Sequence, residues 1–487
     1  MAAASRLILR ALLALAIAGD PAFAAPRSIS RAAGYKVDIT PSLEANRVFL
    51  AGYGAKGRRA EAVHDRLYAR VAVFSDGTKT VAIVSLDLFG LYREDVLDLR
   101  RMSHFDRPDR YLFVTASHTH SGPDTLGMWG PVPGVSGVDQ GYMRGVKEKV
   151  AAAVLTANDR LKQARLRSFS KSVDPKGLCR DRRDPAIVDP VLSVLSAETL
   201  DNKPLATLVN WSCHPEVLDA SNTAVSADFP GSLCARLEAE RGGVCLFLPG
   251  SIGGLMTPDV SPARGFAEVE RVGSELAGHA LAALSGKGGG SMENFPVDFR
   301  SETVRLPIEN SRYLLFLPSL AFGHKLYDPA GTPLPASKAY TLAIRHALTR
   351  LPADRRPWIE TEVSYLTLGR ACGLGLPGEA FPELIIGGYK GEFKASQPLT
   401  DPSNPDPPDL AKAPAGPYLK DLMPCKDKFV VNLANDEIGY LVPEYDFKIR
   451  DNLTLLPRLP GHHYEETNSI GRSATGIVTD SARRLMQ

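Results

Sequence analysis

Two histidines separated by one residue, His118 and His120, follow an apolar, β-branched segment in the stretch VTASHTHSGPD, residues 114–124. Imidazole nitrogens bind divalent metals, and a strand that continued through this stretch would point both rings to one side because successive side chains alternate. The pair could serve one metal, or one histidine could bind a metal while the other meets a substrate. Two ordinary loop histidines are the alternative, and the spacing alone does not choose between these readings.

A second histidine and a glutamate occur in similar local contexts further along the chain. His214 follows an apolar segment in LVNWSCHPEVL, residues 208–218, and Pro215 interrupts regular structure directly after it. Because ligands gather beyond the carboxyl ends of strands in open α/β sheets, two strands that each end in histidine predict a shared metal site. Glu379, in LGLPGEAFPEL, either caps the helix that follows or supplies a third, carboxylate ligand.

Three other polar positions leave alternatives open. Tyr440 lies in NDEIGYLVPEYDF, residues 435–447, where a tyrosine is usually a packing residue, and the residue pattern alone does not select it. His64, in AVHDRLYAR, could line a pocket or lie on the surface. Asp87 and Asp228 could orient a metal-bound histidine or cap local backbone.

The elements that must position these residues alternate between strand-like and helix-like segments. Residues rich in Val, Ile and Phe predict strands at 69–74, 80–90, 110–117, 166–173, 192–200, 204–213 and 244–250. Helical spacing of apolar residues predicts helices at 93–103, 141–161, 228–242 and 266–284. This alternation predicts an α/β fold with an open, mixed β-sheet and flanking helices. A glycine-rich break at 286–294 precedes a less regular second half, in which residues 397–417 read as a proline-rich surface insertion.

Composition is that of a globular protein, with 487 residues, 44% of them hydrophobic, and a net charge of +2. This balance gives no electrostatic reason to expect nucleic acid or an anionic membrane as a partner, so a small-molecule or lipid substrate is expected. Oligomeric state cannot be inferred from the sequence.

Residues 1–24 have the pattern of a secretory signal peptide. Arg6 and Arg10 precede an apolar stretch at 11–19, and Ala22-Phe23-Ala24 forms a small-x-small cleavage pattern. The apolar stretch is shorter than the ~20 residues of a spanning helix, so we expect a periplasmic or secreted protein without a transmembrane segment after cleavage. Six cysteines allow 15 pairings, and in an oxidising compartment we expect one or two disulfides.

Six blocks of this sequence, in order, resemble the neutral/alkaline, non-lysosomal ceramidase family through its N-terminal catalytic domain. ASHTHSGP is the most specific block. The opening block, GYGAKGRRAEAVHDRLYARVAVF with VAIVSLDLFG, precedes it, and four blocks follow: NWSCHP with VSADFPG, VCLFLPGSIGGLMTP, LPGEAF and NDEIGYLVPEYD. The resemblance covers nearly the whole chain after the signal peptide. It implies one catalytic domain over residues 35–480, with the proline-rich insertion at 397–425.

The resemblance also implies an activity and a set of site residues. The family hydrolyses an N-acyl amide with zinc, giving a fatty acid and an amine. Carried over block by block, the implied zinc ligands are His118, His214, Glu379 and Tyr440. His120 would face the reacting centre, and Tyr464 resembles the family's second active-site tyrosine. Arg180 falls near the family's carboxylate-binding arginine, although Cys179 stands where the family tends to have asparagine.

Two departures from the family bear on the substrate. The family's serine in the glycine-rich turn falls at Gly253, and Ser251 is the nearby hydroxyl that could take its place. The chain ends at Gln487, so we expect no C-terminal immunoglobulin-like domain. Three hypotheses follow: a zinc amidohydrolase of ceramide or another N-acyl lipid, a zinc hydrolase of a smaller amide, ester or lactone on the same scaffold, and a non-catalytic exported binding protein.

Overall fold

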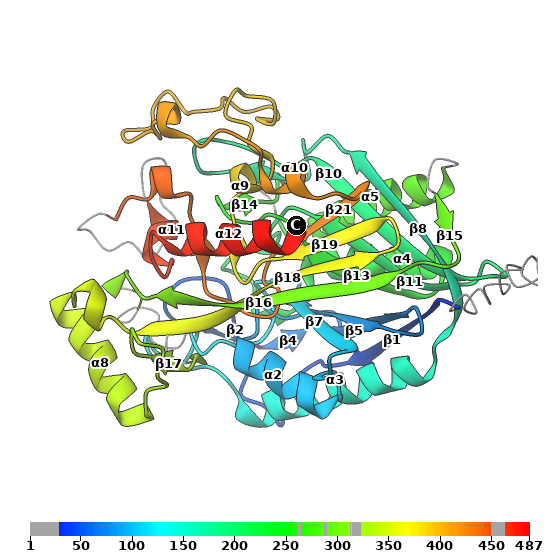
Figure 1. Ribbon diagram of the computed structural model, residues 1–487, viewed down its shortest axis with the longest axis horizontal. Helices are drawn as coiled ribbons and strands as arrows, with labels where there is room; N and C mark the ends of the chain where they lie inside the picture. Colours follow the sequence, from blue (N-terminus) through cyan, green and yellow to red (C-terminus); the bar gives the residue numbers. More distant parts are fainter. Residues whose placement is uncertain (1–28, 261–263, 287–289, 312, 314–322, 450–462) are drawn as a thin grey trace, which may run out of the picture.

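The computed structural model describes residues 29–260, 264–286, 290–311, 313, 323–449 and 463–487 (Figure 1). The predicted signal peptide, residues 1–24, and part of the glycine-rich break lie outside these residues. The described chain forms two large β-sheets with helices packed against their outer faces.

The larger sheet has nine strands in the order β13-β11-β10-β8-β1-β5-β6-β7, with β15 paired to β8. Its strands are β1 (Arg31–Asp38), β5 (Tyr68–Ser75), β6 (Thr80–Leu86), β7 (Arg110–Ala116), β8 (Lys162–Ser172), β10 (Val191–Thr199), β11 (Pro204–Trp211), β13 (Val244–Pro249) and β15 (Ser291–Met292). The strands predicted from the sequence in this half are confirmed.

Two strand–helix–strand units give the larger sheet its mixed character. In one, α2 (Arg93–Met102) connects β6 to β7, and in the other, α4 (Asp228–Arg241) connects β11 to β13; both strand pairs are parallel. The remaining neighbours in the sheet are antiparallel. The sequence prediction of a mixed sheet with flanking helices is therefore confirmed.

The second half of the chain forms a five-stranded sheet that the sequence did not reveal. Its strands are β16 (Val297–Pro307), β17 (Leu326–Tyr327), β18 (Trp358–Leu368), β19 (Ala371–Gly375) and β21 (Asp427–Val431). β19 and β21 pair in parallel although the 51 residues 376–426, including the proline-rich insertion, separate them. This long connection interrupts the local alternation of strands and turns from which a sheet is recognised in a sequence.

The hydrophobic core between the two sheets contains side chains from both. Phe113, Leu208 and Leu246 of the larger sheet belong to one buried cluster with Leu366 and Phe429 of the smaller sheet. Burial of this apolar surface holds the second half of the chain against the first, because apolar area removed from water stabilises the folded state by about 25 cal/mol per Å².

Helices cover the outer faces of both sheets (Figure 1). α2 and α3 (Gln140–Asp159) pack on β1 and β5–β7, while α4 and α5 (Phe266–Ser285) cover β10–β13. α12 (Ala474–Met486) lies across the five-stranded sheet against β16 and β18. The other helices described are α8 (Ala336–Thr349) and the short α9 (Pro382–Ile386), α10 (Leu419–Leu422) and α11 (Tyr464–Thr467), with single turns η1 (Ala353–Arg355), η2 (Leu410–Lys412) and η3 (Glu444–Asp446).

Two disulfides are present, within the range expected from the sequence. Cys234–Cys245 links α4 to β13, and Cys372–Cys425 links β19 to the segment before β21. Cys179 and Cys213 are free and buried.

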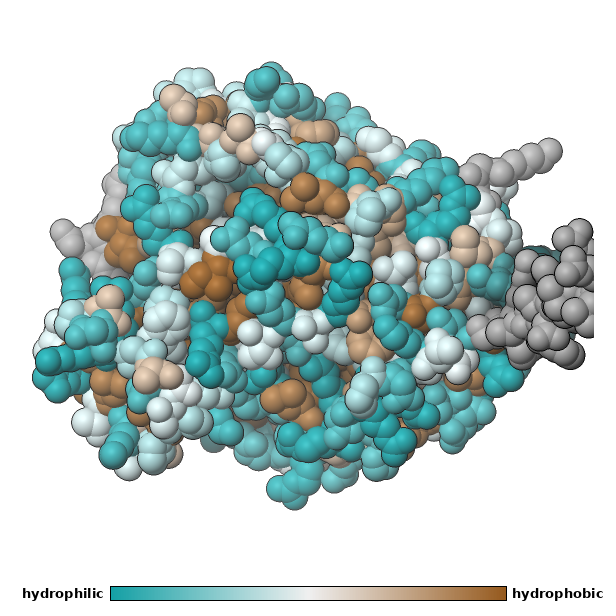
Figure 2. All heavy atoms as spheres, in the orientation of Figure 1, coloured by the Kyte–Doolittle hydropathy of each residue, from teal (hydrophilic) through white to brown (hydrophobic). Residues whose placement is uncertain are grey.

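The surface shown in Figure 2 carries hydrophilic side chains throughout, with hydrophobic ones in separate patches. Among the described residues, no helix combines the length and the apolar composition that crossing a membrane requires.

Candidate metal centre

The carboxyl ends of strands from both sheets meet at Asn432, which follows β21. Its backbone N–H donates to the carbonyl of Pro249 at the end of β13 (3.0 Å), and its carbonyl accepts from Thr115 in β7 (2.9 Å). Its side-chain oxygen accepts from the backbone N–H of Ala380 (2.8 Å). Residues that follow these strand ends are thereby held next to one another although they are far apart in the sequence.

His118 and His120 lie in the turn that follows β7, which ends at Ala116. His118 has a left-handed backbone (φ 72°), a conformation that non-glycine residues adopt rarely and mostly where the surrounding structure requires it. The two rings lie 5.3 Å apart between centroids. Both histidines face the same site, as the spacing suggested, but the turn rather than strand alternation brings them together.

His118 and His214 are held in the same way. The Nδ1 of His118 lies 2.8 Å from the carbonyl of Phe89, and the Nδ1 of His214 lies 2.7 Å from the carbonyl of Met256. A carbonyl accepts only from a protonated nitrogen, so each ring carries a proton on Nδ1 and turns Nε2 toward the centre of the cluster. Fixing the ring through the other nitrogen is the usual arrangement of metal-binding histidines.

The Glu379 carboxylate lies between these two inward-facing nitrogens. Its Oε2 is 2.9 Å from Nε2 of His214, and its Oε1 is 3.7 Å from Nε2 of His118. Glu379 belongs to β20 (Glu379–Ala380), which pairs in parallel with β22 (Tyr440–Leu441) and places Tyr440 directly opposite Glu379. No side chain caps α9, so helix capping by Glu379, the alternative considered from the sequence, is excluded.

The side chains of His118, His120 and His214 could hold a metal ion together. All three are buried, and one ring nitrogen from each lies within 4.8 Å of the other two. His120 differs from its neighbours, because neither of its ring nitrogens has a hydrogen-bond partner among the described residues. A buried polar atom without a hydrogen-bond partner destabilises the folded state, so the unpartnered nitrogens of His120 fit a metal ion or another ligand at the centre of the cluster.

Burial and charge set the protonation of these groups. Burial lowers the pKa of His118 to about 4 and that of His120 well below its ordinary value, which favours the neutral imidazole that binds a metal. Burial also acts to lower the pKa of His214, but the hydrogen bond and charge of Glu379 outweigh it and raise this pKa. Burial together with the Glu379 charge raises the pKa of Tyr440 well above its ordinary value.

Packing against Gly52 and Tyr53 fixes the ring of His120. Gly52 has φ +96°, and a Cβ at this position would lie 2.3 Å from Cγ of the imidazole, so only glycine allows this approach. Tyr53 contacts the ring edge-on at 4.9 Å, and Arg58 donates to the carbonyl of His120. The carboxylate of Glu216 lies 3.6 Å from Nδ1 of His120.

A cavity opens at this cluster. Its lining includes the apolar side chains of Phe89, Leu126, Met128 and Trp129 and the polar side chains of Glu437, Tyr440, Tyr464 and Asn468. The ring of Tyr464 lies 6.0 Å from that of Tyr440. The cavity therefore offers both apolar surface and polar groups next to the histidines.

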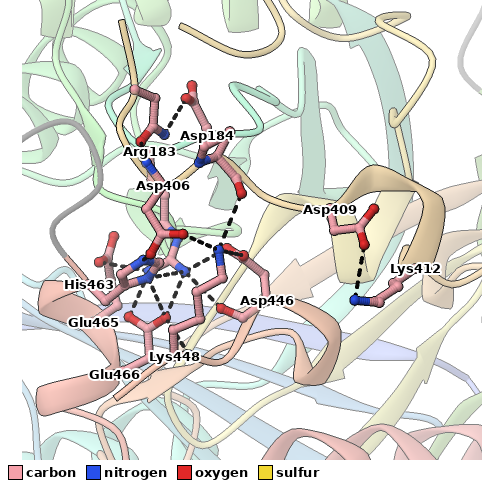
Figure 3. A network of polar contacts seen from close by, with 12 residues as sticks. Arg183, Asp184, Asp406, Asp409, Lys412, Asp446, Lys448, His463, Glu465 and Glu466 are labelled. Carbon is pink, nitrogen blue, oxygen red and sulfur yellow. Dashed lines mark hydrogen bonds and ion pairs between the residues drawn. The ribbon is translucent and has the colours of Figure 1, made fainter. Parts of the chain in front are cut away.

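A buried ionic network anchors α11, the helix that begins at Tyr464 (Figure 3). The Arg183 guanidinium donates to Glu465 (3.0 Å), Glu466 (2.8 Å) and Asp446 (2.8 Å). His463 lies 2.9 Å from Glu466 and 3.0 Å from Asp406, which belongs to the proline-rich insertion. The network thus connects the insertion to the segment that carries Tyr464.

Three residues selected from the sequence do not line this cavity. Arg180 forms the short strand β9 (Arg180–Asp181) opposite Thr257 and is exposed. His64 is exposed and stacks on Phe266 at 3.5 Å. Ser251 is fully buried, and its hydroxyl has no partner among the described residues. Their catalytic and substrate-binding roles stay predictions.

The two aspartates considered as orienting residues have other partners. Asp87 pairs with Arg70 and accepts from the backbone of Tyr68. Asp228 accepts from the backbone N–H groups of Leu218 (3.1 Å) and Phe229 (2.7 Å), which fixes the loop after His214 to the start of α4. Among the described residues, neither aspartate forms a hydrogen bond or an ion pair with a histidine of the cluster.

Glu437 is a cavity residue that reasoning from the sequence missed. It lies in the turn between β21 and β22 and is 2% exposed. Burial and the nearby Glu379 charge raise its pKa well above the ordinary value. Its place in the acidic pair Asp436-Glu437, directly before Ile438-Gly439-Tyr440, was the signal in the sequence that could have pointed to it.

Comparison with known proteins finds a family match in the first half of the chain. Residues 34–246 match the family described as neutral/alkaline non-lysosomal ceramidase, N-terminal. A search of curated proteins found no match.

Solved ceramidase structures have a similar fold over nearly the whole chain. Neutral ceramidase from Pseudomonas aeruginosa matches with a TM-score of 0.64 at 17% identity, covering 94% of this chain and 74% of that one. A ceramidase complexed with C2 matches with a TM-score of 0.65 at 16% identity, covering 94% of this chain and 75% of that one.

Proposed function

We propose that this chain, whose residues 34–246 match the neutral/alkaline non-lysosomal ceramidase family, is a ceramidase-like hydrolase and, more specifically, a zinc-dependent amidohydrolase. Its substrate would be an N-acyl amide, with ceramide or another N-acyl lipid as the first candidate. One observation carries the proposal: the buried cluster of His118, His120 and His214 around the Glu379 carboxylate.

We assign the zinc ligands as His118, His214, Glu379 and Tyr440. The Nδ1 atoms of His118 and His214 both face backbone carbonyls, which turns Nε2 of each ring toward the centre of the cluster. A metal there would replace the proton that His214 shares with Glu379. His120 has no such carbonyl, so we place it beside the reacting centre rather than among the ligands. Zinc in such a site acidifies a bound water to a pKa of ~7 and polarises a carbonyl.

The remaining side chains of the site would bind and move protons. His120, neutral at physiological pH because burial lowers its pKa, can accept a proton from the attacking water and pass one to the leaving amine. Tyr464 can donate a hydrogen bond to the oxygen that becomes negative in the tetrahedral intermediate. We also propose roles in substrate binding for Arg180 and His64 and in catalysis for Ser251. None of the three lines the cavity, so these roles require their side chains to move toward it.

A smaller amide, ester or lactone is the second candidate substrate. The enclosed space beside the histidines is about 50 Å³, far below the roughly 300–1,000 Å³ of usual small-molecule sites, so a compact substrate fits this site better than a long acyl chain. A long acyl chain would contact the apolar side chains of Phe89, Leu126, Met128 and Trp129 and extend out of the cavity into solvent. The non-catalytic binding protein is the third reading, and turnover of any substrate would exclude it.

Metal content and hydrolysis test the proposal together. Protein purified without added metal should hold about one zinc per chain and should release fatty acid from an N-acyl amide. The His214→Ala variant should lose both properties, and His279→Ala, a histidine of α5 outside the site, should keep both. Absence of zinc in the parent protein after reconstitution would contradict the proposal.

Export is a separate part of the proposal. It rests on the signal-peptide pattern of residues 1–24, and two disulfides fit an oxidising compartment. Mass spectrometry of protein recovered from the periplasm or medium should give a mature chain that begins near residue 25. No nucleic-acid partner is proposed.

A further inference from the structure

The fold brings the six cysteines of this chain together in three pairs. Two of the pairs are the disulfides Cys234–Cys245 and Cys372–Cys425. The third pair, Cys179 and Cys213, has free thiols, and both side chains are buried in the apolar cluster that α4 and α5 cover. The cysteines that are left over after the two disulfides are therefore neighbours in space.

The two free thiols contact each other, and the backbone around them is held in place. The thiol of Cys179 interacts with that of Cys213 through a side-chain hydrogen bond. Sγ of Cys213 also donates to the carbonyl of Leu178, the residue before Cys179 (3.7 Å). The backbone N–H of Cys179 donates to the carbonyl of Pro175 (2.8 Å). Their contact is thus a built feature of the folded chain rather than a chance approach of two surface side chains.

This pair lies next to the backbone that holds His214. The carbonyl of Met256 accepts from the backbone N–H of His214 (3.0 Å) and from its Nδ1–H (2.7 Å). β14 (Met256–Thr257) also pairs with β9. Cys213 directly precedes His214, and Cys179 directly precedes β9. A bond between the two cysteines would therefore join the two segments that β14 already connects through hydrogen bonds.

We propose that Cys179 and Cys213 form a third disulfide in the exported protein, and that this bond fixes the position of His214. The inference rests on the export proposed above, and the bond itself does not depend on the amidohydrolase function. Buried thiols in an apolar cluster otherwise act as small apolar side chains. Two thiols that contact each other in an oxidising compartment are instead expected to be bonded.

The bond forms by exchange with a disulfide oxidant. The thiolate of one cysteine attacks a sulfur of the oxidant, which releases one oxidant thiol and leaves a mixed disulfide. The second cysteine thiolate then attacks the protein sulfur of the mixed disulfide and releases the other oxidant thiol. The two protein thiols lose two protons and two electrons, and the oxidant gains them. Because both thiols are buried once the chain has folded, the exchange takes place before folding is complete.

Thiol counting in the full chain tests the bond. Protein recovered from the periplasm or medium without a reductant is unfolded in urea with N-ethylmaleimide, and its intact mass is measured. We expect no added label, six labels after reduction, and a peptide pair joined through Cys179 and Cys213 after cleavage without reduction. Labels on these two cysteines, or a bond from either of them to another partner, would overturn the proposal. If the chain is not exported, the same count on chain refolded with oxidised glutathione decides.

A zinc competition assay with a chromophoric chelator tests the effect on His214. Two variants cannot form the bond: Cys179→Ala, and Cys179→Ala/Cys213→Val, in which valine restores apolar volume. Both should bind zinc about tenfold or more weakly than oxidised wild type, because loss of a partner that orients a metal-bound histidine costs about 10–100-fold in affinity. Cys234→Ser/Cys245→Ser removes a disulfide at the start of β13, away from the strand ends, and should keep the wild-type affinity.

The outcomes separate the bond, its effect and the proposed function. Wild-type zinc affinity in both variants would overturn the positioning role, and wild-type affinity in the valine variant alone would assign the effect to packing and overturn it as well. Thermal unfolding establishes that each variant is folded. If wild-type protein binds no zinc, the metal proposal fails instead, and the thiol count alone decides whether the third disulfide exists.

Discussion

The three histidines of the cluster differ in how their rings are fixed, and this difference separates two kinds of role. His118 and His214 each donate Nδ1–H to a backbone carbonyl, whereas the ring of His120 is held by packing against Gly52 and Tyr53. A ring fixed by a carbonyl presents one defined lone pair, as a metal ligand must. A ring held by packing alone can exchange protons at either nitrogen.

Substitution of His120 should therefore separate activity from metal binding. We expect His120→Ala to retain most of its zinc but to lose about 10²–10⁴-fold in kcat, the usual contribution of a general acid–base group. His118→Ala should lose zinc and activity together. Metal analysis beside steady-state kinetics of both variants measures this, and loss of zinc from His120→Ala would assign His120 to the ligands.

Asp228 gives the folded protein a pH dependence whose sign follows from its burial. Burial raises its pKa from 3.8 to about 7. Between these values the folded chain keeps a proton that the unfolded chain has lost, so this group lowers the free energy of unfolding as the pH rises. Asp228→Asn cannot ionise and should gain stability relative to wild type as the pH goes from 4 to 7, by at most about 1.4 kcal/mol per pH unit.

Urea unfolding in the presence of a chelator, which removes the pH dependence of metal binding, measures this difference. Asp109→Asn, at an exposed aspartate, should follow the wild-type curve. Parallel curves for wild type and Asp228→Asn would show that Asp228 ionises normally in the folded state.

At the scale of elements, the short strand β20 and the turn after β13 are packed so closely that a side chain has no room between them. A Cβ at Gly253 would lie 2.5 Å from Cδ2 of Phe381 and 2.7 Å from the carbonyl of Glu379. Gly253 also donates its N–H to Ala380 (3.1 Å). The family resemblance assigns a serine to position 253. In this protein, the space that its side chain would need is occupied by the backbone of Glu379, a proposed zinc ligand, and by Phe381.

Restoring that serine should damage the site. We expect Gly253→Ser to lower the free energy of unfolding by about 1–3 kcal/mol, the usual cost of overpacking, and to reduce zinc content because β20 must move. Gly145→Ser, where a Cβ meets nothing within 4 Å, should have little effect on either. Thermal unfolding and metal analysis compare the two, and a stable, zinc-loaded Gly253→Ser protein would contradict this account.

These elements also show why one part of the site could be predicted and another could not. His118 and His214 follow long, apolar strands whose pattern is visible in the sequence, so their position at the sheet edge followed from general rules. Glu379 and Tyr440 lie in strands of two residues that pair only with each other. Strands that short have no periodicity, and only the family resemblance pointed to these residues. Glu437 was missed because its burial comes from a turn between distant segments.

For the whole molecule, the two disulfides close loops of different lengths. Cys372–Cys425 spans 53 residues that include the proline-rich insertion, and Cys234–Cys245 spans 11. Replacing both cysteines of the longer loop with serine should cost about 2–4 kcal/mol. If the entropy of the unfolded chain dominates, replacing the shorter pair should cost about 1.4 kcal/mol less. Urea unfolding of the two double variants compares these losses, and equal losses would show that loop length is not the controlling quantity.

The site is shared between the two halves of the chain, and this division affects how relatives of the protein should be interpreted. The family match ends at residue 246, and the two histidines assigned as zinc ligands lie within it. Five residues that line the cavity lie beyond it: Glu379, Glu437, Tyr440, Tyr464 and Asn468. Sequence changes confined to the second half could therefore change which molecules are cleaved while the half that matches the family stays the same. Proteins grouped by their first half alone would have only the two histidines of the proposed metal site in common, and they need not share a substrate.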